Sequence, residues 1–301
     1  MLRTIFLGCL LTASNSFAAI NVVGFTTETN DRFTNDPTFF AGGLDLSGVG
    51  LAETTSNAFA GDDGGRWVTM VSQNAFVSAN HFYPSNGSPV TFYQSNDPLG
   101  ASFTTTIQSL SRVGSTDIRV GVLTDPLPVG YAFYSLWDVP VAGDTREVLV
   151  PNLLTFGRSP TNFADISQDM AVGYNQFDIY YSDISVSGAT GDAAAMVFDS
   201  PGLDFESQFA LGDSGAPAMV LAGGELTIVG VNWFTATING GATDISGVSY
   251  LPNYQTEIDA LVAASAVPIP EPGFGSLGMG LVAMLYLYAS SRRQVLPKKI
   301  Y

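Results

Sequence analysis

Three short segments of this chain carry side chains that could act together in acyl transfer. The only histidine of the sequence, His81, comes first, Asp117 follows it, and Ser214 lies within Leu211-Gly212-Asp213-Ser214-Gly215. A hydroxyl is almost wholly protonated at neutral pH, so a serine nucleophile needs an adjacent base, and that base needs a third group to hold its tautomer. The sequence therefore predicts a catalytic set of Ser214, His81 and Asp117.

The segment around Ser214 also holds groups that could stabilise a negatively charged intermediate. Glycines at 212 and 215 allow a tight loop in which the amides of Gly212 and Ser214 point at one developing oxyanion. A surface turn would explain Gly-Asp-Ser-Gly if that sequence stood alone. The nucleophile elbow of α/β-hydrolases is disfavoured, because it requires Gly-x-Ser-x-Gly and the order Ser, Asp, His, whereas this chain has His, Asp, Ser.

Together these segments resemble the catalytic segments of the chymotrypsin/trypsin-like serine peptidases. Ser78-Ala79-Asn80-His81 stands where that family has small-Ala-Ala-His, and Asp117-Ile118-Arg119-Val120 is similar to its Asp-Ile-x-Leu strand. The resemblance implies an acyl-enzyme mechanism in which His81 is the general base and Asp117 orients it. Asp125 competes for that role, but an Asp before proline favours a turn. Asp117 itself could also be an ordinary turn acid at a strand edge.

The resemblance also implies which residues would meet a polypeptide substrate. Counting back from Ser214, Gln208 falls at the base of the primary pocket, where trypsin-like specificity requires a carboxylate, so we expect no preference for Arg or Lys. Asn232-Trp233-Phe234 is similar to the strand that pairs with the substrate, and Gly247 to a glycine of the pocket wall. Phe234 would narrow the entrance and favour a small or medium apolar residue before the cleaved bond, unless its ring packs in the core instead.

The residue before the serine has a structural role in that family. It accepts the mature N-terminal ammonium or an equivalent partner and so shapes the serine loop. In this chain that residue is Asp213. The exported chain is expected to begin with Ala19-Ile20, and the sequence leaves open whether the same pairing forms.

The first residues are typical of a secretory signal peptide. Arg3 precedes an apolar run, and Ser16-Phe17-Ala18 offers small residues at the two positions that a signal peptidase inspects. Cleavage after Ala18 removes residues 1–18, whereas a cut one residue later would put the bulky Phe17 at an inspected position. The only cysteine, Cys9, leaves with this peptide, so the exported chain can form no disulfide and no Cys-based metal site.

The C-terminal end has a composition of its own. Pro270-Glu271-Pro272 is followed by an apolar stretch from Phe274 to Ala289 and then by Arg292-Arg293 and two lysines. About 16 helical residues rise about 24 Å, less than the ~30 Å core of a bilayer, so a stable span is marginal. The order resembles a PEP-CTERM sorting signal. This implies that an exosortase processes residues 267–301 and that the protein reaches the surface or matrix of a Gram-negative bacterium, with transient anchoring in the inner membrane. An ordinary C-terminal anchor has the same order.

Charge narrows the range of partners. Of the 27 acidic residues only Glu271 lies outside residues 19–267, whereas five of the 11 basic residues do. That region therefore holds six arginines, no lysine and a net charge of about −20. Such a field repels phosphate backbones, so we expect no nucleic-acid partner. We also expect no cofactor, although the sequence leaves open a calcium ion near Asp31 and Asp36 or near Asp62 and Asp63.

Short runs of β-branched and aromatic residues between Gly, Pro, Asn and Asp clusters predict an all-β fold. They include residues 67–71, 89–93, 102–107, 118–123, 132–136, 177–181, 226–233 and 247–251. The resemblance implies two antiparallel six-stranded β-barrels, at residues 19–140 and 141–266, with a junction near residues 138–150. The helical spacing of Tyr254, Ile258, Leu261 and Val262 predicts a C-terminal helix that closes the second barrel, and a short hydrophobic helix is expected in the tail.

The sequence thus predicts an exported or surface-sorted serine endopeptidase that acts on polypeptides. The alternative is a non-catalytic surface or matrix binding protein on the same scaffold, since a fold does not guarantee chemistry. Esterase activity on the same residues is also left open.

Overall fold

The computed structural model describes residues 19–53, 65–145, 150, 152–160, 166–199 and 202–265. The predicted signal peptide, the C-terminal tail with its expected helix, and Asp62 and Asp63 lie outside these residues. None of the helices within the described ranges has the length and apolar character needed to cross a membrane. The described chain is mostly β-structure, which confirms the fold class at that level.

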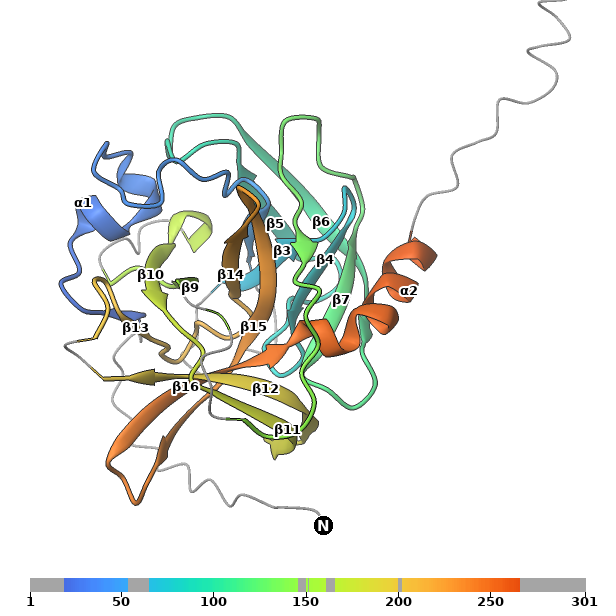
Figure 1. Ribbon diagram of the computed structural model, residues 1–301. Coiled ribbons are helices and arrows are strands. Elements are labelled where there is room, and N and C mark those ends of the chain that lie inside the picture. Colours follow the sequence, from blue (N-terminus) through green and yellow to red (C-terminus); the bar gives the residue numbers. More distant parts are fainter. Residues whose placement is uncertain are drawn as a thin grey trace, which may run out of the picture. The chain divides into compact units, whose positions relative to one another are not determined.

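Six antiparallel strands form a closed barrel in the order β2-β3-β4-β7-β6-β5 (Figure 1). Phe76 on β4 lies opposite Gly121 on β7, and a Cβ atom at position 121 would come within 2.1 Å of the Phe76 ring. The ring therefore fills the barrel interior across a position where only glycine leaves room for it. The strands are β2 (Val49–Ala52), β3 (Arg66–Met70), β4 (Ala75–Ala79), β5 (Pro89–Tyr93), β6 (Ser102–Arg112) and β7 (Ile118–Leu123).

The second sheet has eight strands in the order β10-β9-β14-β15-β16-β12-β11, with β8 paired in parallel to β15. It curls into a half-barrel, and the second closed barrel that we expected is not formed. The strands are β8 (Ser135–Leu136), β9 (Leu153–Gly157), β10 (Ala171–Asn175), β11 (Ile179–Val186), β12 (Ala189–Phe198), β14 (Pro217–Ala222), β15 (Glu225–Ile238) and β16 (Thr243–Tyr250).

An interruption between β10 and β11 explains why the second sheet is open. These strands lie at its two ends, yet they are consecutive in the chain and only Gln176, Phe177 and Asp178 separate them. The side-chain oxygen of Asn175 accepts the amide of Gln176 (2.7 Å), and the carboxylate of Asp178 accepts the amide of Val197 (2.8 Å). Side chains thus take two backbone donors at the point where β10 ends and β11 begins.

Buried apolar side chains form three main groups. One fills the barrel around Phe76, and another fills the curled sheet around Phe177. The largest contains Trp67 from the barrel together with Phe156 and Val231 from the second sheet. The two sheets therefore share a continuous core, and burial of apolar surface holds them together in a chain that has no disulfide.

The C-terminal helix α2 (Gln255–Ser265) forms where the spacing predicts it. Ile258 is buried, and Leu261 and Val262 pack half-buried against the core that joins the sheets. The helix packs against β7, and the side-chain amide of Asn74 donates to the carbonyl of Ser265 (2.8 Å) (Figure 1). It therefore covers the first barrel, and the expectation that it closes the second one is wrong.

Short elements complete the described chain. β1 (Asn21–Val22) pairs with β13 (Ser207–Gln208) in a separate two-stranded sheet. The helix α1 (Thr27–Asn30) follows β1, and the hydroxyl of Thr26 caps it by accepting the amide of Thr29 (3.2 Å). Three 3-10 helices span Arg32–Thr34, Ile166–Gln168 and Leu251–Tyr254.

The contact between Phe76 and Gly121 provides a test of the barrel. We expect Gly121→Ala to destabilise the protein by about 1–3 kcal/mol, because the added methyl group must displace a ring in a packed interior. The control is Gly43→Ala, at a position where a Cβ atom meets nothing within 4 Å, and we expect it to change stability by less than about 0.5 kcal/mol. Urea denaturation measures both, and equal effects would show that the ring can move aside.

Candidate active site

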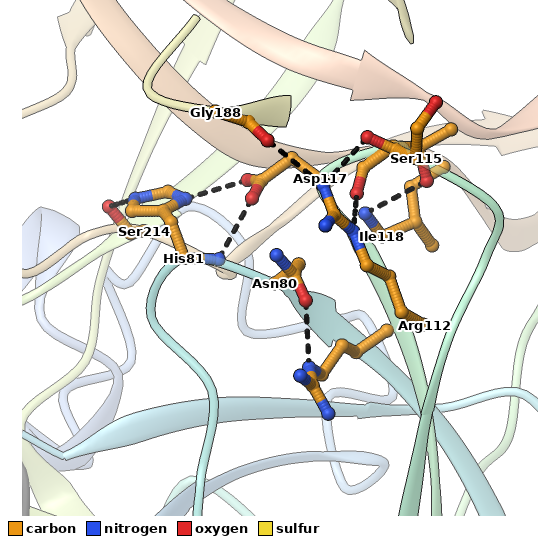
Figure 2. A network of polar contacts seen from close by, with 10 residues as sticks. Asn80, His81, Arg112, Ser115, Asp117, Ile118, Gly188 and Ser214 are labelled. Atoms are coloured by element: carbon orange, nitrogen blue, oxygen red, sulfur yellow. Dashed lines mark hydrogen bonds and ion pairs between the residues drawn. The ribbon is translucent and has the colours of Figure 1, made fainter. Parts of the chain in front are cut away.

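The ladder between β4 and β7 brings His81 to Asp117. Ala79 at the end of β4 pairs with Ile118 at the start of β7, so the residues just beyond this pair meet at the same edge. The amide of Asn80 donates to the carbonyl of Asp117 (3.0 Å), and the amide of His81 donates to Oδ1 of Asp117 (2.8 Å). Nδ1 of His81 lies 2.7 Å from Oδ2 of Asp117 (Figure 2). The carboxylate thus holds both the backbone and the ring of the histidine.

Ser214 reaches the same histidine from the second sheet. It lies in the loop between β13 and β14, and its Oγ is 2.9 Å from Nε2 of His81 (Figure 2). The next residue, Gly215, has a φ of 85°, and a Cβ atom there would lie 3.0 Å from the amide nitrogen of Ala79 and 3.0 Å from Oγ of Ser78. Glycine at this position therefore lets the serine loop lie directly on the end of β4.

Burial gives the three side chains different properties. The side chain of Asp117 is fully buried, whereas that of His81 is 29% exposed and Ser214 is half-buried. A carboxylate only accepts hydrogen bonds, so Nδ1 of His81 must carry a proton in this pair. In the neutral ring Nε2 then has its lone pair directed to the hydroxyl of Ser214, which is the geometry of a base beside a nucleophile. The competitor Asp125 interacts instead with Thr105, through its amide and its carboxylate.

The loop before Ser214 leaves two amides available. Ala210 to Asp213 form a turn closed by the amide of Asp213 and the carbonyl of Ala210 (3.2 Å), and Gly212 at the third position has a φ of 98°. A positive φ there is typical of a type II turn and requires glycine. Within the described part of the chain, the amides of Gly212 and Ser214 donate to no acceptor. They are the two donors that the sequence assigns to an oxyanion.

Asp213 is fully buried and has backbone partners. Its carboxylate accepts the amide of Arg158 (2.7 Å) and the amide of Ala210 (2.8 Å). Ile20 lies close by, and its amide donates to the carbonyl of Arg158 (3.1 Å). Burial raises the pKa of Asp213 to about 8, although both amides and the charge of Arg158 oppose that shift.

More buried acids lie behind this loop. The guanidinium of Arg158 pairs with Asp169 (2.7 Å), and the hydroxyl of Ser159 donates to the buried carboxylate of Asp31 (2.6 Å). Burial raises the pKa of Asp169 to about 6, against the opposing effect of Arg158. Asp213 and Asp169 thus both interact with Arg158, and the nearby charge of Asp31 raises the pKa of Asp169 further.

The residues expected to meet a substrate lie along β13, β15 and β16. Asn232 is buried, and its side-chain amide donates to the carbonyls of Phe156 (3.0 Å) and Asp213 (3.1 Å), so it supports the serine loop. Trp233 is also buried, beneath the β11–β12 hairpin. Gln208 is half-buried on β13, where it pairs with Asn21.

Phe234 and Gly247 are opposite each other on β15 and β16. A Cβ atom at Gly247 would come within 2.2 Å of the Phe234 ring, so the ring occupies the space beside that glycine. Phe234 is only half-buried and also packs with apolar side chains of β11 and β12. The ring therefore packs against neighbours and also lies beside Gly247, and its effect on a substrate stays a prediction.

The possible calcium positions are occupied by other contacts or are not described. Asp31 accepts the amide of Phe33 (2.9 Å) besides the hydroxyl of Ser159, and Asp36 accepts the amide and the hydroxyl of Thr38. Among the residues that the structure describes, no group of three or more His, Cys, Asp or Glu side chains could hold a metal ion.

Sequence reasoning missed several residues that support the site. The indole of Trp67 donates to the carbonyl of Gly212 (3.3 Å), and no sequence signal points to this contact. Composition could have singled out Arg158 and Arg112, because residues 19–267 hold only six arginines and no lysine against 26 acidic residues, which leaves few cations to pair with buried acids or to donate to carbonyl oxygens.

Comparison with known proteins identifies no family. The chain matches no model of a known protein family, and none of the curated proteins that were compared matches it. An assignment of function to this chain therefore has to come from the geometry of the site itself.

The buried carboxylate of Asp213 predicts that stability falls as the pH rises. The folded protein holds a proton on Asp213 up to a pKa of about 8, whereas the unfolded chain releases it near the ordinary pKa of 3.8. Stability is therefore fully present below the unfolded value and is lost as the pH approaches 8, by up to about 1.4 kcal/mol per pH unit for this group. In Asp213→Asn this part of the slope should vanish. Denaturant titrations at pH 5 to 8 compare the two slopes, and identical slopes would exclude the assignment.

Proposed function

We propose that this protein is a serine endopeptidase in which Ser214 is the nucleophile, His81 the general base and Asp117 the group that orients the base. One observation carries the proposal: a single imidazole contacts a serine hydroxyl at 2.9 Å and a buried carboxylate at 2.7 Å. These distances lie in the range in which a base takes a proton from its nucleophile. A two-barrel fold of the chymotrypsin type is part of this proposal, with the curled sheet in the place of the second barrel.

The proposed reaction proceeds through an acyl-enzyme. Oγ of Ser214 attacks the carbonyl carbon while Nε2 of His81 takes the hydroxyl proton, and the amides of Gly212 and Ser214 stabilise the oxyanion. His81 then gives that proton to the leaving amine as the carbon–nitrogen bond breaks. Water attacks the ester with His81 again as base, and the proton returns to Ser214 as the acid product leaves. Asp117 stays ionised and stabilises the imidazolium.

An extended polypeptide suits the edge beside the serine loop. Asn232 exchanges backbone hydrogen bonds with Gly215 and Ala216 (both 2.9 Å), so β15 runs directly out from the nucleophile. β14 pairs with β15 only as far as Val231, and beyond that residue β16 is the only described strand that pairs with it. An unpaired edge can accept another strand through its backbone groups, which supports a peptide substrate.

The alternative is a non-catalytic binding protein on this scaffold. An occluded or misaligned set of residues would favour it, but His81 and Ser214 are both accessible to solvent and Asp117 is buried behind them. This arrangement supports the hydrolase. An esterase would use the same residues, and a comparison of peptide and ester substrates separates these two activities.

Export and sorting complete the proposal. Residues 1–18 would act as the signal peptide and residues 267–301 as a PEP-CTERM-like signal processed by an exosortase. The protein would then work at the cell surface or in the matrix of a Gram-negative bacterium, after transient anchoring in the inner membrane. An acidic chain with no disulfide is compatible with that location.

Labelling by a fluorophosphonate tests the proposed chemistry. We expect one label per chain on Ser214 in the wild type, and no label in Ser214→Ala. His81→Gln should slow labelling by about 100-fold or more, because the hydroxyl loses its base. Mass spectrometry of the labelled peptide locates the site. A folded wild type that stays unlabelled at pH 8 would favour the binding protein.

Substitution of Phe234 tests the expected specificity. Because the ring lies beside Gly247, we expect the wild type to cleave after small or medium apolar residues. Because Gln208 stands where a preference for Arg or Lys would require a carboxylate, we expect no cleavage after those residues. Phe234→Gly should open that space and raise kcat/KM for a large apolar residue before the cleaved bond by about tenfold or more relative to alanine. The control is Thr235→Gly, at the exposed neighbour on the same strand. Fast cleavage after Arg by the wild type would refute this reading.

A further inference from the structure

The turn that carries Asp117 joins β6 to β7 and is held by its own backbone. Val113 donates its amide to the carbonyl of Ile118 (3.0 Å) and accepts both the amide and the hydroxyl of Thr116 (3.1 and 2.6 Å). The hydroxyl of Thr116 in turn accepts the amide of Ile118 (3.2 Å). These bonds leave the carbonyls of Ser115 and Thr116 directed away from the turn, next to Asp117.

The guanidinium of Arg112 binds both of these carbonyls. Nε donates to the carbonyl of Thr116 (2.7 Å) and Nη2 donates to that of Ser115 (2.7 Å) (Figure 2). The carbonyl of Thr116 belongs to the peptide group that precedes the Cα of Asp117. Because that peptide group is planar, holding its carbonyl also holds the Cα of Asp117, to which the carboxylate-bearing side chain is attached.

A hairpin of the second sheet closes over the same turn. Ser187 and Gly188 connect β11 to β12 with φ values of 50° and 82°, as a type I′ hairpin turn requires. The carbonyl of Gly188 accepts a third hydrogen bond from Arg112 (3.4 Å) (Figure 2). The amide of Thr190 donates to the carbonyl of Ser115 (2.9 Å). One guanidinium thus joins the end of β6, the Asp117 turn and the second sheet.

The charge of Arg112 does not explain this arrangement. Arg112 is exposed, so water and salt screen its field, and no contact joins its guanidinium to the carboxylate of Asp117 within the described residues. Nε and Nη2 of Arg112 instead offer two N–H donors in a fixed planar geometry that matches two neighbouring carbonyls, and a lysine ammonium does not reproduce this geometry.

We propose that Arg112 is a positioning residue, which orients the Asp117–His81 pair by clamping the peptide group before Asp117 against the β11–β12 hairpin. This inference rests on the function proposed above, because it assigns Arg112 a role in the same site. Arg112 touches neither the substrate nor the reacting atoms, and it acts through the backbone of Asp117.

The variants Arg112→Lys and Arg112→Ala test the proposal, with Gln108→Ala on the exposed part of the same strand as the control. We expect both Arg112 variants to slow fluorophosphonate labelling of Ser214 by at least about tenfold, because a displaced carboxylate misaligns the base. The control should label at the wild-type rate. Arg112→Lys keeps the positive charge and removes the planar pair of donors, so it separates an effect of charge from an effect of hydrogen-bond geometry.

Proton NMR supplies a readout that does not need Ser214 to react. His81 is the only histidine, so the low-field resonance of its Nδ1 proton reports the hydrogen bond to Asp117 without assignment by mutagenesis. We expect this resonance to shift or broaden in both Arg112 variants and to remain in Gln108→Ala.

Several outcomes would overturn the proposal. Wild-type labelling and an unchanged resonance in Arg112→Lys and Arg112→Ala would show a purely structural role, even if both melt at lower temperature. Full activity in Arg112→Lys alone would show that charge suffices. Loss of folding in both variants would assign Arg112 to the fold as a whole. If the wild type is not labelled, the proposed hydrolase fails, but the resonance still decides whether Arg112 positions the pair.

Discussion

The serine loop of the curled sheet lies directly on the end of β4, and Gly215 makes this approach possible. A side chain at that position would meet the amide of Ala79 and the hydroxyl of Ser78, both at 3.0 Å from the added atom. The loop or the strand end would have to give way by a few tenths of an ångström, and the 2.9 Å contact between Ser214 and His81 would change with it. The contact between Ser214 and His81, and with it the proposed chemistry, therefore depends on how closely two separate sheets approach, and both contribute to the shared core around Trp67 and Val231.

Buried arginine links distant segments of this chain, whose single cysteine allows no internal disulfide. Arg32 is almost fully buried, and it donates to the side chain of Asn96 (3.1 Å) and to the carbonyls of Val49 (3.3 Å) and Tyr93 (3.0 Å) in the barrel. Burial lowers the pKa of Arg32 to about 10, so the group still carries its charge at neutral pH. The preceding residue, Asp31, bonds Ser159 on the other side. Two adjacent residues thus fasten the N-terminal segment to both halves of the molecule.

Much of the site could be predicted from sequence because its chemistry is local. A few neighbouring residues are enough to suggest each role. The serine lies between glycines, the histidine follows a buried strand, and the aspartate precedes another strand. The strands at 89–93 and 118–123 have the predicted bounds, since their apolar pattern matches their burial. The helix at 255–265 likewise follows from the spacing of Ile258, Leu261 and Val262. Local patterns did not predict which sheet the helix packs against.

The remaining features depend on contacts between distant residues, for which a short pattern carries no information. The second sheet stays open between β10 and β11, where Asn175 and Asp178 take backbone donors, yet Asn and Asp in such a segment are equally typical of an ordinary turn. The partners of Asp213 are likewise set by residues far from it in the sequence or by the fold of its loop. Its carboxylate accepts amides of Arg158 and Ala210, so the shape of the serine loop follows from backbone donors and from burial that favours the protonated acid. Two backbone amides therefore hold this loop in the described chain, and the proton on Asp213 links the stability of the fold to the solvent pH.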